Sequence, residues 1–321
     1  MKEGEKKMSK KTIIRALSVA LVAVLAAGTF MLGGCAANNA TDSGSGETNS
    51  GGSGDSGNGT SSLPINVVSR EDGSGTRSAF VELFEVQVEN ADGKKVDATT
   101  QDAVITNSTS VTLTTVAGDS AAIGYISLGS MNETVKALDI DGAAATTANV
   151  KSGTYPIQRD FNIATLPDIS DAAQDFINFI MSKEGQKVIE DNHYIAANEN
   201  ASAFKTNDAS GKVVVGGSSS VSPVMEKLVE AYATANPNVT IEMQTSDSSV
   251  GMSSTIEGVL EIGMASRALK DSELEKGLTP TKIAIDGLAV IVNNDNPVSG
   301  MSKDQVQKIF LGEIKNWADI K

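Results

Sequence analysis

Cysteine, histidine and aromatic residues are scarce in this sequence. Its 321 residues include one Cys and one His, and Phe, Trp and Tyr together make up 4%. With Cys35 alone, neither a disulfide within the chain nor a cysteine-based metal site can form. No cluster of His and Asp suits a pair of metal ions. We therefore expect no metal and no cofactor.

Positive charge is also in short supply. The chain has 26 Lys and Arg against 40 Asp and Glu, a formal net charge of -14 at pH 7. A nucleic-acid surface needs clustered Lys and Arg, and no basic patch with interleaved aromatics occurs, so nucleic acid is excluded as a partner. Hydrophobic residues make up 40%, which is enough for a core. The length indicates two globular domains or lobes.

The N-terminal segment, residues 1–34, has the pattern of a secretory signal. Residues 1–15 are basic and residues 16–32 are apolar. That apolar run approaches the length that spans a membrane, so an uncleaved anchor helix is the alternative. The small residues before Cys35 favour cleavage.

The tetrapeptide Leu-Gly-Gly-Cys that ends at Cys35 resembles the lipobox of bacterial lipoproteins. This resemblance implies that Cys35 is lipidated after removal of residues 1–34 and holds the protein at the membrane. Residues 35–62 are mostly Gly, Ser and Asn, with a few acids. A segment of this composition cannot bury a core and is predicted to be a disordered, flexible tether.

From residue 63 onward, apolar strands and amphipathic helices alternate. Residues 63–70 are typical of a strand, residues 77–86 of a helix, and residues 168–192 of a helical region capped by Ser170 or Asp171. The apolar run at residues 283–295 predicts a long strand that continues between the lobes. Such alternation predicts an α/β fold with a mostly parallel sheet, whose ligands bind beyond the carboxyl ends of the strands.

Four Ser-rich turns occupy such positions. The turns around Ser74, Ser219 and Ser248 each precede a predicted helix, the second of them with Ser222 as its predicted N-cap. A helix N-terminus exposes unpaired N–H groups, Ser and Thr add donors, and Gly lets the backbone approach a ligand, so together they suit an anion. Arg70 adds a bidentate fork for a tetrahedral oxyanion. One such turn is most often only a helix cap, but several in one α/β chain favour a shared anion site.

Five segments resemble those of the phosphate-binding lipoproteins that serve bacterial ABC phosphate importers. They are residues 69–80, 216–228, 244–254, 261–271 and 308–320, and the first carries the specific signature Arg-x-Asp-Gly-Ser-Gly-Thr. The resemblance covers almost all of residues 63–321. It implies a two-lobe, periplasmic-binding-protein-like (type II) fold with a hinge and a central anion cleft.

The resemblance also implies a set of ligand-binding residues divided between the lobes. One lobe contributes Ser219, Ser220 and Ser248, and the other Arg70, Ser74, Gly75 and Thr76. Asp72 is expected to orient Arg70 or its loop.

The order of these segments departs from the family. There, the segment that resembles residues 216–228 comes first, and the Asp-Gly-Ser-Gly-Thr segment follows the one that ends here at residue 320. The order indicates a circular permutation, with the family's usual ends joined near residues 197–212. Exposed loops tolerate such a rearrangement. A fragment or a misjoined gene is the alternative.

The permuted order predicts one continuous lobe and one assembled from two segments. The first lobe spans residues 156–285, and the second combines residues 63–155 with residues 286–321. The crossings near residues 154–159 and 285–292 are the predicted hinge.

A second departure concerns the loop at Ser266 and Arg267. Some members of the family have an Asp there, which accepts the proton of hydrogen phosphate and so excludes sulfate. Here Ser266 stands at that position, with Arg267 beside it. Asp72 or Asp247 is the candidate replacement acceptor.

These observations predict an extracytoplasmic, lipid-anchored, monomeric receptor that captures inorganic phosphate and delivers it to the permease subunits of an ABC importer. The alternatives are a receptor for sulfate, molybdate or tungstate, a lipoprotein that binds nothing, and a phosphatase or serine hydrolase. An enzyme with Ser74 as nucleophile needs a base. The lone His193, at a helix end, is more typical of a surface or capping residue, so we expect no catalysis.

Overall fold

The computed structural model describes residues 63–320. The predicted signal segment, Cys35 and the predicted tether therefore lie outside the described residues. Within the described range, no helix has the length and apolar character that crossing a bilayer requires.

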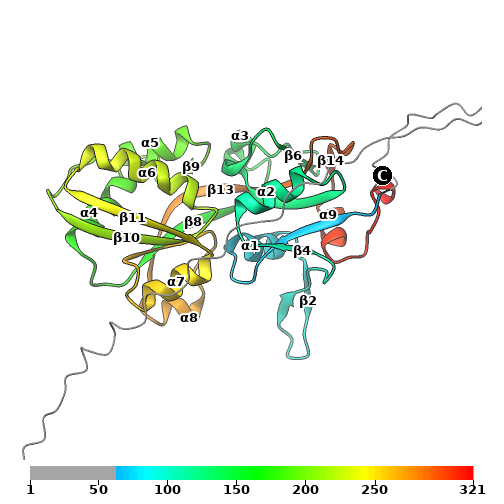
Figure 1. Cartoon of the computed structure of the whole chain (residues 1–321), viewed down its shortest axis with the longest axis horizontal. Helices are drawn as coiled ribbons and strands as arrows, with labels where there is room; N and C mark the ends of the chain where they lie inside the picture. Colours follow the sequence, from blue (N-terminus) through cyan, green and yellow to red (C-terminus); the bar gives the residue numbers. More distant parts are fainter. Residues whose placement is uncertain (1–62, 321) are drawn as a thin grey trace, which may run out of the picture. The chain divides into compact units, whose positions relative to one another are not determined.

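Ten strands of the described chain form one mixed sheet (Figure 1). They are β1 (Asn66–Arg70), β4 (Val104–Thr106), β5 (Ala122–Ser127), β6 (Val135–Ala137), β8 (Gln158–Thr165), β9 (Ile195–Ala196), β10 (Gly211–Ser218), β11 (Val239–Ser246), β12 (Ile262–Ala265) and β13 (Thr279–Asn293). Their order is β11-β10-β12-β8-β13-β5-β1-β4, with β6 and β9 also paired to β13. Two small pairs complete the strands: β2 (Gln87–Glu89) with β3 (Lys95–Asp97), and β7 (Asp139–Ile140) with β14 (Gly300–Met301).

Helices connect and cover these strands. They are α1 (Gly75–Leu83), α2 (Thr109–Ala117), α3 (Thr147–Ser152), α4 (Asp171–Ile180), α5 (Lys183–Asp191), α6 (Ser222–Ala235), α7 (Ser248–Ile256), α8 (Asp271–Leu274) and α9 (Lys303–Phe310), with short 3-10 turns η1 (Leu128–Ser130) and η2 (Trp317–Asp319). The predicted α/β alternation is confirmed. The prediction of a mostly parallel sheet is wrong, because β13 pairs antiparallel with β5, β6, β8 and β9, and β8 pairs antiparallel with β12.

The long predicted strand is β13, and it changes partner along its length. Residues 279–287 pair antiparallel with β8, and residues 288–292 pair antiparallel with β5. The side chains of β13 alternate between the two faces of the sheet, as a strand requires. Leu288, Val290 and Val292 belong to one apolar cluster, and Ala289 and Ile291 belong to another.

Two main hydrophobic cores lie along the sheet. The first core contains Phe80 and Phe84 at the end of α1, Val306 and Phe310 of α9, and Tyr125 of β5. The smaller cluster around Val116 of α2 lies on the opposite face of the same strands. Helices therefore cover both faces, as they do in α/β proteins.

The second core is built by α4, α5 and α6 against β8, β10, β12 and β13. Its fully buried members include Phe161, Phe176, Met225, Leu228 and Tyr232. Met252 of α7 packs with Ala164, Ala265 and Leu278 in a separate, smaller cluster. Both Met225 and Met252 are thus core residues.

Of the predicted helix N-caps, Ser170 is confirmed and Ser222 is not. Ser170 caps α4, since its Oγ accepts from the Ala173 N–H at 3.1 Å. The predicted helical region of residues 168–192 is two helices, and Ser182 caps the second. Ser222 is not the predicted N-cap: it is the first helical residue of α6, and its hydroxyl bonds the Ser218 carbonyl and Thr245 instead.

Candidate functional site

The Ser-rich turns meet where several strands end. β1, β10, β11 and β12 end at Arg70, Ser218, Ser246 and Ala265, and β10 runs parallel to both β11 and β12. The first three strands are followed by α1, α6 and α7, respectively. Through β5, β13, β8 and β12, the strand pairing makes β1 run opposite to β10 and β11. The helix N-terminus after β1 therefore faces those after β10 and β11, and the contacts between Arg70 and Ser219 and between Thr76 and Ser220 join them.

Hydroxyl groups from these turns form a connected group, which we call the hydroxyl cluster. It consists of Thr76, Thr109, Ser218, Ser219, Ser220, Ser248 and Ser266, and each of them is buried. Small polar side chains at this depth need hydrogen-bond partners, and they find them largely in one another.

The shortest contact of the cluster joins two turns that are distant in sequence. Thr76 Oγ1 and Ser220 Oγ lie 2.6 Å apart, and Thr109 Oγ1 lies 3.2 Å from the same Ser220 oxygen. α2, which begins at Thr109, therefore supplies a further helix N-terminus. A helix N-terminus favours negative charge nearby.

The remaining hydroxyls link the turns after β10, β11 and β12. Ser218 Oγ donates to Ser266 Oγ at 2.9 Å, and the Ser266 N–H donates to Ser248 Oγ at 3.1 Å. Each hydroxyl can both donate and accept, so the group can rearrange its hydrogen bonds without moving heavy atoms far.

Two glycines let the turn after β1 approach the turns after β11 and β12. A Cβ on Gly75 would lie 2.6 Å from Ser266 Oγ and would also overlap Ser248 Oγ. Gly73 has a φ of +90°, a conformation open to glycine, and its carbonyl accepts from the Ser249 N–H at 3.2 Å. The family signature thus needs glycine at both positions for steric reasons.

Arg70 joins the cluster from the end of β1. Its side chain is buried, and Nη2 donates to Ser219 Oγ at 3.1 Å. The guanidinium is held by Glu71, which accepts from Nε at 2.8 Å and from Nη2 at 2.7 Å. The Arg70 N–H donates to the Tyr125 hydroxyl at 3.2 Å. Burial raises the pKa of Tyr125 to about 12, so this phenol stays protonated.

The structure brings most of the predicted residues together and gives others local roles. Arg70, Gly75, Thr76, Ser219, Ser220, Ser248 and Ser266 make the contacts given above. Ser74 is buried beside them, but its Oγ caps α1 by accepting from the Arg77 N–H at 3.3 Å. Asp247 likewise caps α7, through the Val250 N–H at 2.9 Å, and its carboxylate faces Gly73.

Asp72 does not contact Arg70. Its side chain is 97% exposed and pairs with Arg77, whose Nη1 lies 3.0 Å from Asp72 Oδ1. The same Nη1 donates to the Arg70 carbonyl at 2.8 Å, so Asp72 contacts the loop through Arg77. Arg267 forms two hydrogen bonds with Glu273, at 2.9 and 2.8 Å, and one with Ser249 at 3.3 Å.

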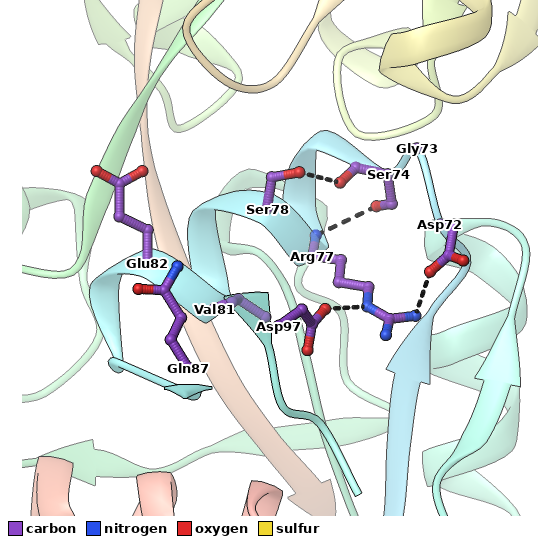
Figure 2. A pocket seen from close by; sticks show the side chains of 9 residues that line it. All are labelled: Asp72, Gly73, Ser74, Arg77, Ser78, Val81, Glu82, Gln87 and Asp97. Atoms are coloured by element: carbon purple, nitrogen blue, oxygen red, sulfur yellow. Dashed lines mark hydrogen bonds and ion pairs between the residues drawn. The ribbon is translucent and has the colours of Figure 1, made fainter. Parts of the chain in front are cut away.

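A pocket of about 400 Å³ lies beside the same turn (Figure 2). Arg77 and Asp97 form its polar wall through a 2.6 Å ion pair, and Ser78 Oγ donates to the Ser74 carbonyl at 3.1 Å. Burial acts to raise the pKa of Asp97, but hydrogen bonds from Thr99 and Arg77 hold it below its ordinary value. The residues that line this pocket include Gly73 and Ser74 but none of the hydroxyl cluster, so we do not take the pocket as the candidate site.

Sequence reasoning missed Thr109, Ser218 and Glu71. Thr109 follows Ser108, which caps α2 by accepting from the Val111 N–H, so residues 107–110 carry the same cap signature as the other turns. Ser218 belongs to the Ser run that the sequence singled out. Glu71 has no local signal, because its contact with Arg70 depends on how the chain turns after β1.

No metal site accompanies the cluster in the described part of the chain. Residues 63–320 contain no group of three or more His, Cys, Asp and Glu that could hold a metal. His193 is exposed, immediately after α5.

Known proteins share this architecture. The family described as "PBP superfamily domain" matches residues 40–184 and 202–321. The "Phosphate-binding protein PstS 2" of Streptococcus agalactiae is 53% identical over 257 residues, which are 80% of this chain and 87% of that protein. The crystal structure of a phosphate-binding protein of a phosphate ABC transporter from Streptococcus pneumoniae is 47% identical, with a TM-score of 0.64, and covers 81% of this chain and 100% of that one.

A third relative aligns over a much shorter stretch. The "Phosphate-binding protein PstS" of Bacillus subtilis is 35% identical over 114 residues, which are 35% of this chain and 38% of that protein.

The fold is thus the α/β fold of the PBP superfamily. The extent and identity of the matches show that the chain belongs to the PstS family of phosphate-binding proteins. These are transport proteins and not enzymes, which answers the enzyme alternative.

Proposed function

We propose that this chain binds inorganic phosphate at the hydroxyl cluster and delivers it to the permease of an ABC importer. The observation that carries the proposal is the convergence of Arg70 and Thr76 with Ser219 and Ser220, from turns almost 150 residues apart. Arg70 Nη2 lies 3.1 Å from Ser219 Oγ, and Thr76 Oγ1 lies 2.6 Å from Ser220 Oγ. The family membership supports phosphate as the oxyanion.

The chemistry of the cluster suits a small tetrahedral oxyanion. Hydroxyls and the N-terminal N–H groups of α1, α2, α6 and α7 supply donors in several directions, and helix N-termini favour negative charge. Arg70 adds a charge-assisted fork. The single guanidinium and the backbone dipoles can hold an anion although the chain as a whole is acidic.

We infer that the two cores belong to two lobes that move about the β8–β13 crossing. The second core lies within the predicted lobe of residues 156–285. The first core is built mostly by residues 63–155 and 286–321, with Ile157 and Ile195 added from the other predicted lobe. Phosphate would bind between the lobes and favour the closed arrangement, because both lobes then contact one ligand. β13, which pairs with β8 and then with β5, is the continuous element across the hinge.

We also infer that the chain is a circular permutation of the usual family order. The chain before β1 lies beside the segment that follows α9: the Ile65 N–H donates to the Lys315 carbonyl at 2.7 Å, and the Trp317 N–H to the Leu63 carbonyl at 3.1 Å. A relative with another segment order aligns in one stretch over only part of a permuted chain, and the Bacillus subtilis match covers 38% of that protein. The Streptococcus agalactiae relative, aligned over 257 residues, supports a genuine order rather than a misjoined gene.

The inferred joint between the family's usual ends is fastened to the second core. The buried Asp175 accepts from the Asn207 N–H at 2.8 Å and from the Tyr232 hydroxyl at 2.8 Å. Burial acts to raise the pKa of Asp175, but these and further donors hold it below its ordinary value, which favours the ionised acceptor. The joint is thus held by specific contacts.

The role in import requires an extracytoplasmic position. The Leu-Gly-Gly-Cys motif at residues 32–35 supports lipidation at Cys35, and residues 35–62 supply a Gly- and Ser-rich tether. A monomer on such a tether can exchange between free phosphate and the permease.

The experiment that tests the proposal is calorimetric titration of phosphate into the Arg70→Ala variant. Charge-assisted hydrogen bonds contribute about 1.5–3 kcal/mol each, so we expect the affinity to fall at least ~10-fold. Lys212→Ala is the control, since Lys212 is an exposed cation at the opposite end of β10. Wild-type protein that gives no heat with phosphate, or an Arg70→Ala variant that binds as tightly as wild type, contradicts the proposal.

Titrations of sulfate and molybdate test the oxyanion alternative. Ser266 replaces the Asp that accepts the proton of hydrogen phosphate in some relatives, so the cluster has a hydroxyl at that position. If sulfate or molybdate binds more tightly than phosphate, the chain is a receptor for that oxyanion instead.

A further inference from the structure

The carboxylate that holds Arg70 comes from its neighbour in the sequence. Glu71 accepts from two nitrogens of the guanidinium, Nε at 2.8 Å and Nη2 at 2.7 Å. Two parallel hydrogen bonds fix the plane of a guanidinium as well as its position. Asp72, one residue further along, is turned to solvent and pairs with Arg77.

The planar geometry of the guanidinium divides its donors between two edges. Glu71 takes the edge formed by Nε and Nη2. The second hydrogen of Nη2 points along the other edge, which Nη2 shares with Nη1, and Nη2 donates to Ser219 Oγ at 3.1 Å. Glu71 therefore supports the guanidinium from behind, and the Nη1–Nη2 edge faces the hydroxyl cluster.

Arg70 needs the carboxylate of Glu71 because its guanidinium is buried. The Arg70 side chain is 2% exposed and that of Glu71 is 20% exposed. A buried charge without a partner is strongly unfavourable, and a long side chain without a fixed partner samples several rotamers. Glu71 also lines a pocket of about 350 Å³ with Thr99 and Gln101, so its carboxylate lies between that pocket and the buried guanidinium.

We propose that Glu71 is the positioning residue of Arg70, which presents the Nη1–Nη2 edge of the guanidinium to the bound oxyanion. The inference rests on the proposed function, since the oxyanion is the phosphate of that site. Glu71 itself does not touch phosphate. Its effect on affinity passes entirely through Arg70.

A double-mutant cycle tests this role. If Glu71 acts only through Arg70, its removal does not change phosphate affinity in a variant that already lacks Arg70. Phosphate is titrated calorimetrically into wild type, Glu71→Ala, Arg70→Ala and the double variant. We expect Glu71→Ala to weaken binding about tenfold when Arg70 is present. In the Arg70→Ala background we expect a change of less than about twofold.

Two further variants separate positioning from general damage. Asp72→Ala is the matched control: it removes the adjacent carboxylate, and we expect an affinity within about twofold of wild type. Glu71→Gln keeps the side-chain volume and one acceptor, so it replaces Glu71→Ala in the cycle if the alanine variant does not fold.

Each outcome bears on a different claim. Equal losses in both backgrounds, unchanged or tighter binding by Glu71→Ala, or an equal loss for Asp72→Ala overturns the role of Glu71. A loss of phosphate affinity that Glu71→Ala causes only when Arg70 is present supports the positioning role of Glu71. Wild-type protein that does not bind phosphate overturns the proposed function first, and this inference with it.

Discussion

The β8–β13 crossing and the hydroxyl cluster both lie between the two cores, and their contacts are of different kinds. At the β8–β13 crossing, Arg159 and Asp286 form a buried ion pair: Nε and Nη2 of Arg159 lie 3.1 and 3.0 Å from Asp286 Oδ2. Ser127 Oγ donates to the other carboxylate oxygen at 2.8 Å. In the hydroxyl cluster, neutral oxygens such as those of Thr76 and Ser220 meet across the turns.

This difference indicates which of the two sets of contacts, the Arg159–Asp286 pair or the hydroxyl cluster, is harder to separate. Separating a buried ion pair leaves two unpaired charges, so the crossing resists rearrangement. Separating two hydroxyls costs far less, because water or a phosphate oxygen can replace either partner. We infer that the crossing holds the fold together, whereas the cluster opens and closes around the ligand.

Removing Asp286 should give the largest effect. Arg159 is 6% exposed and Asp286 is 1% exposed. Burial shifts both groups toward their neutral forms: it raises the pKa of Asp286 and lowers that of Arg159. Asp286→Ala leaves the buried guanidinium uncompensated, and we expect a loss of about 3–5 kcal/mol in the free energy of unfolding, measured by urea denaturation.

Asp160→Ala is the control for that measurement. Asp160 lies next to Arg159 in β8 and pairs with Lys282 at 2.7 Å, but both side chains are at least 40% exposed. Exposed pairs contribute about 0–1 kcal/mol, so a small change is expected. If Asp286→Ala and Asp160→Ala lose similar amounts of unfolding free energy, the buried Arg159–Asp286 pair stabilises the fold no more than an exposed pair does.

Gly75→Ala should affect the cluster without affecting the crossing. The added Cβ would overlap Ser248 Oγ and lie 2.6 Å from Ser266 Oγ, so the turns could not meet. Gly75 is the first residue of α1, so the exchange should change the stability of the helix itself little, and we expect the fold to keep its stability. We expect phosphate affinity to fall at least ~10-fold, measured by calorimetry.

Unfolding of the same variant in urea provides the second readout. If Gly75→Ala loses stability in proportion to phosphate affinity, the hydroxyl cluster is needed to hold the fold together and does not simply open and close around the ligand. Phosphate affinity equal to that of wild type would mean that the turns do not need to approach this closely for binding.

The sequence predicted what local patterns encode. The apolar run at residues 283–295 identified β13, and the Ser before α4 identified its cap. The positions of the Ser-rich turns explain why Ser219 and Ser248 lie together, since β10 and β11 are parallel and their carboxyl ends share one edge of the sheet. Thr76 follows β1, which runs the opposite way, and it meets Ser220 from the facing side.

Contacts that depend on competition between partners escaped prediction. Ser222 has the side chain of an N-cap, yet Thr245 and the Ser218 carbonyl are nearer partners for its hydroxyl. Asp72 has the spacing of the family signature, yet Glu71 reaches Arg70 and Arg77 takes Asp72. Such choices depend on turn geometry and on residues far along the chain.

Removing the charge of Glu273 should have a smaller effect on stability than removing Asp286. Glu273 pairs with Arg267, which also reaches Ser249 beside the cluster. Burial acts to raise the pKa of Glu273, but hydrogen bonds from Arg267 and from the Lys270 N–H hold it below its ordinary value of 4.5. A carboxyl whose folded-state pKa is lowered stabilises the fold above its unfolded-state pKa, and this contribution is lost as the pH falls through the folded-state pKa.

Glu273→Gln should therefore cost about 1 kcal/mol of unfolding free energy at pH 7, since one acceptor remains. The difference from wild type should narrow below pH 4.5, as Glu273 of the wild type becomes protonated. Glu275→Gln, at an exposed carboxylate two residues away, should match wild type at both pH values within about 0.5 kcal/mol. If the difference in unfolding free energy between wild type and Glu273→Gln stays constant from pH 7 to pH 3, the charge of Glu273 does not stabilise the fold. The Arg267–Glu273 pair would then contribute only through packing and neutral hydrogen bonds.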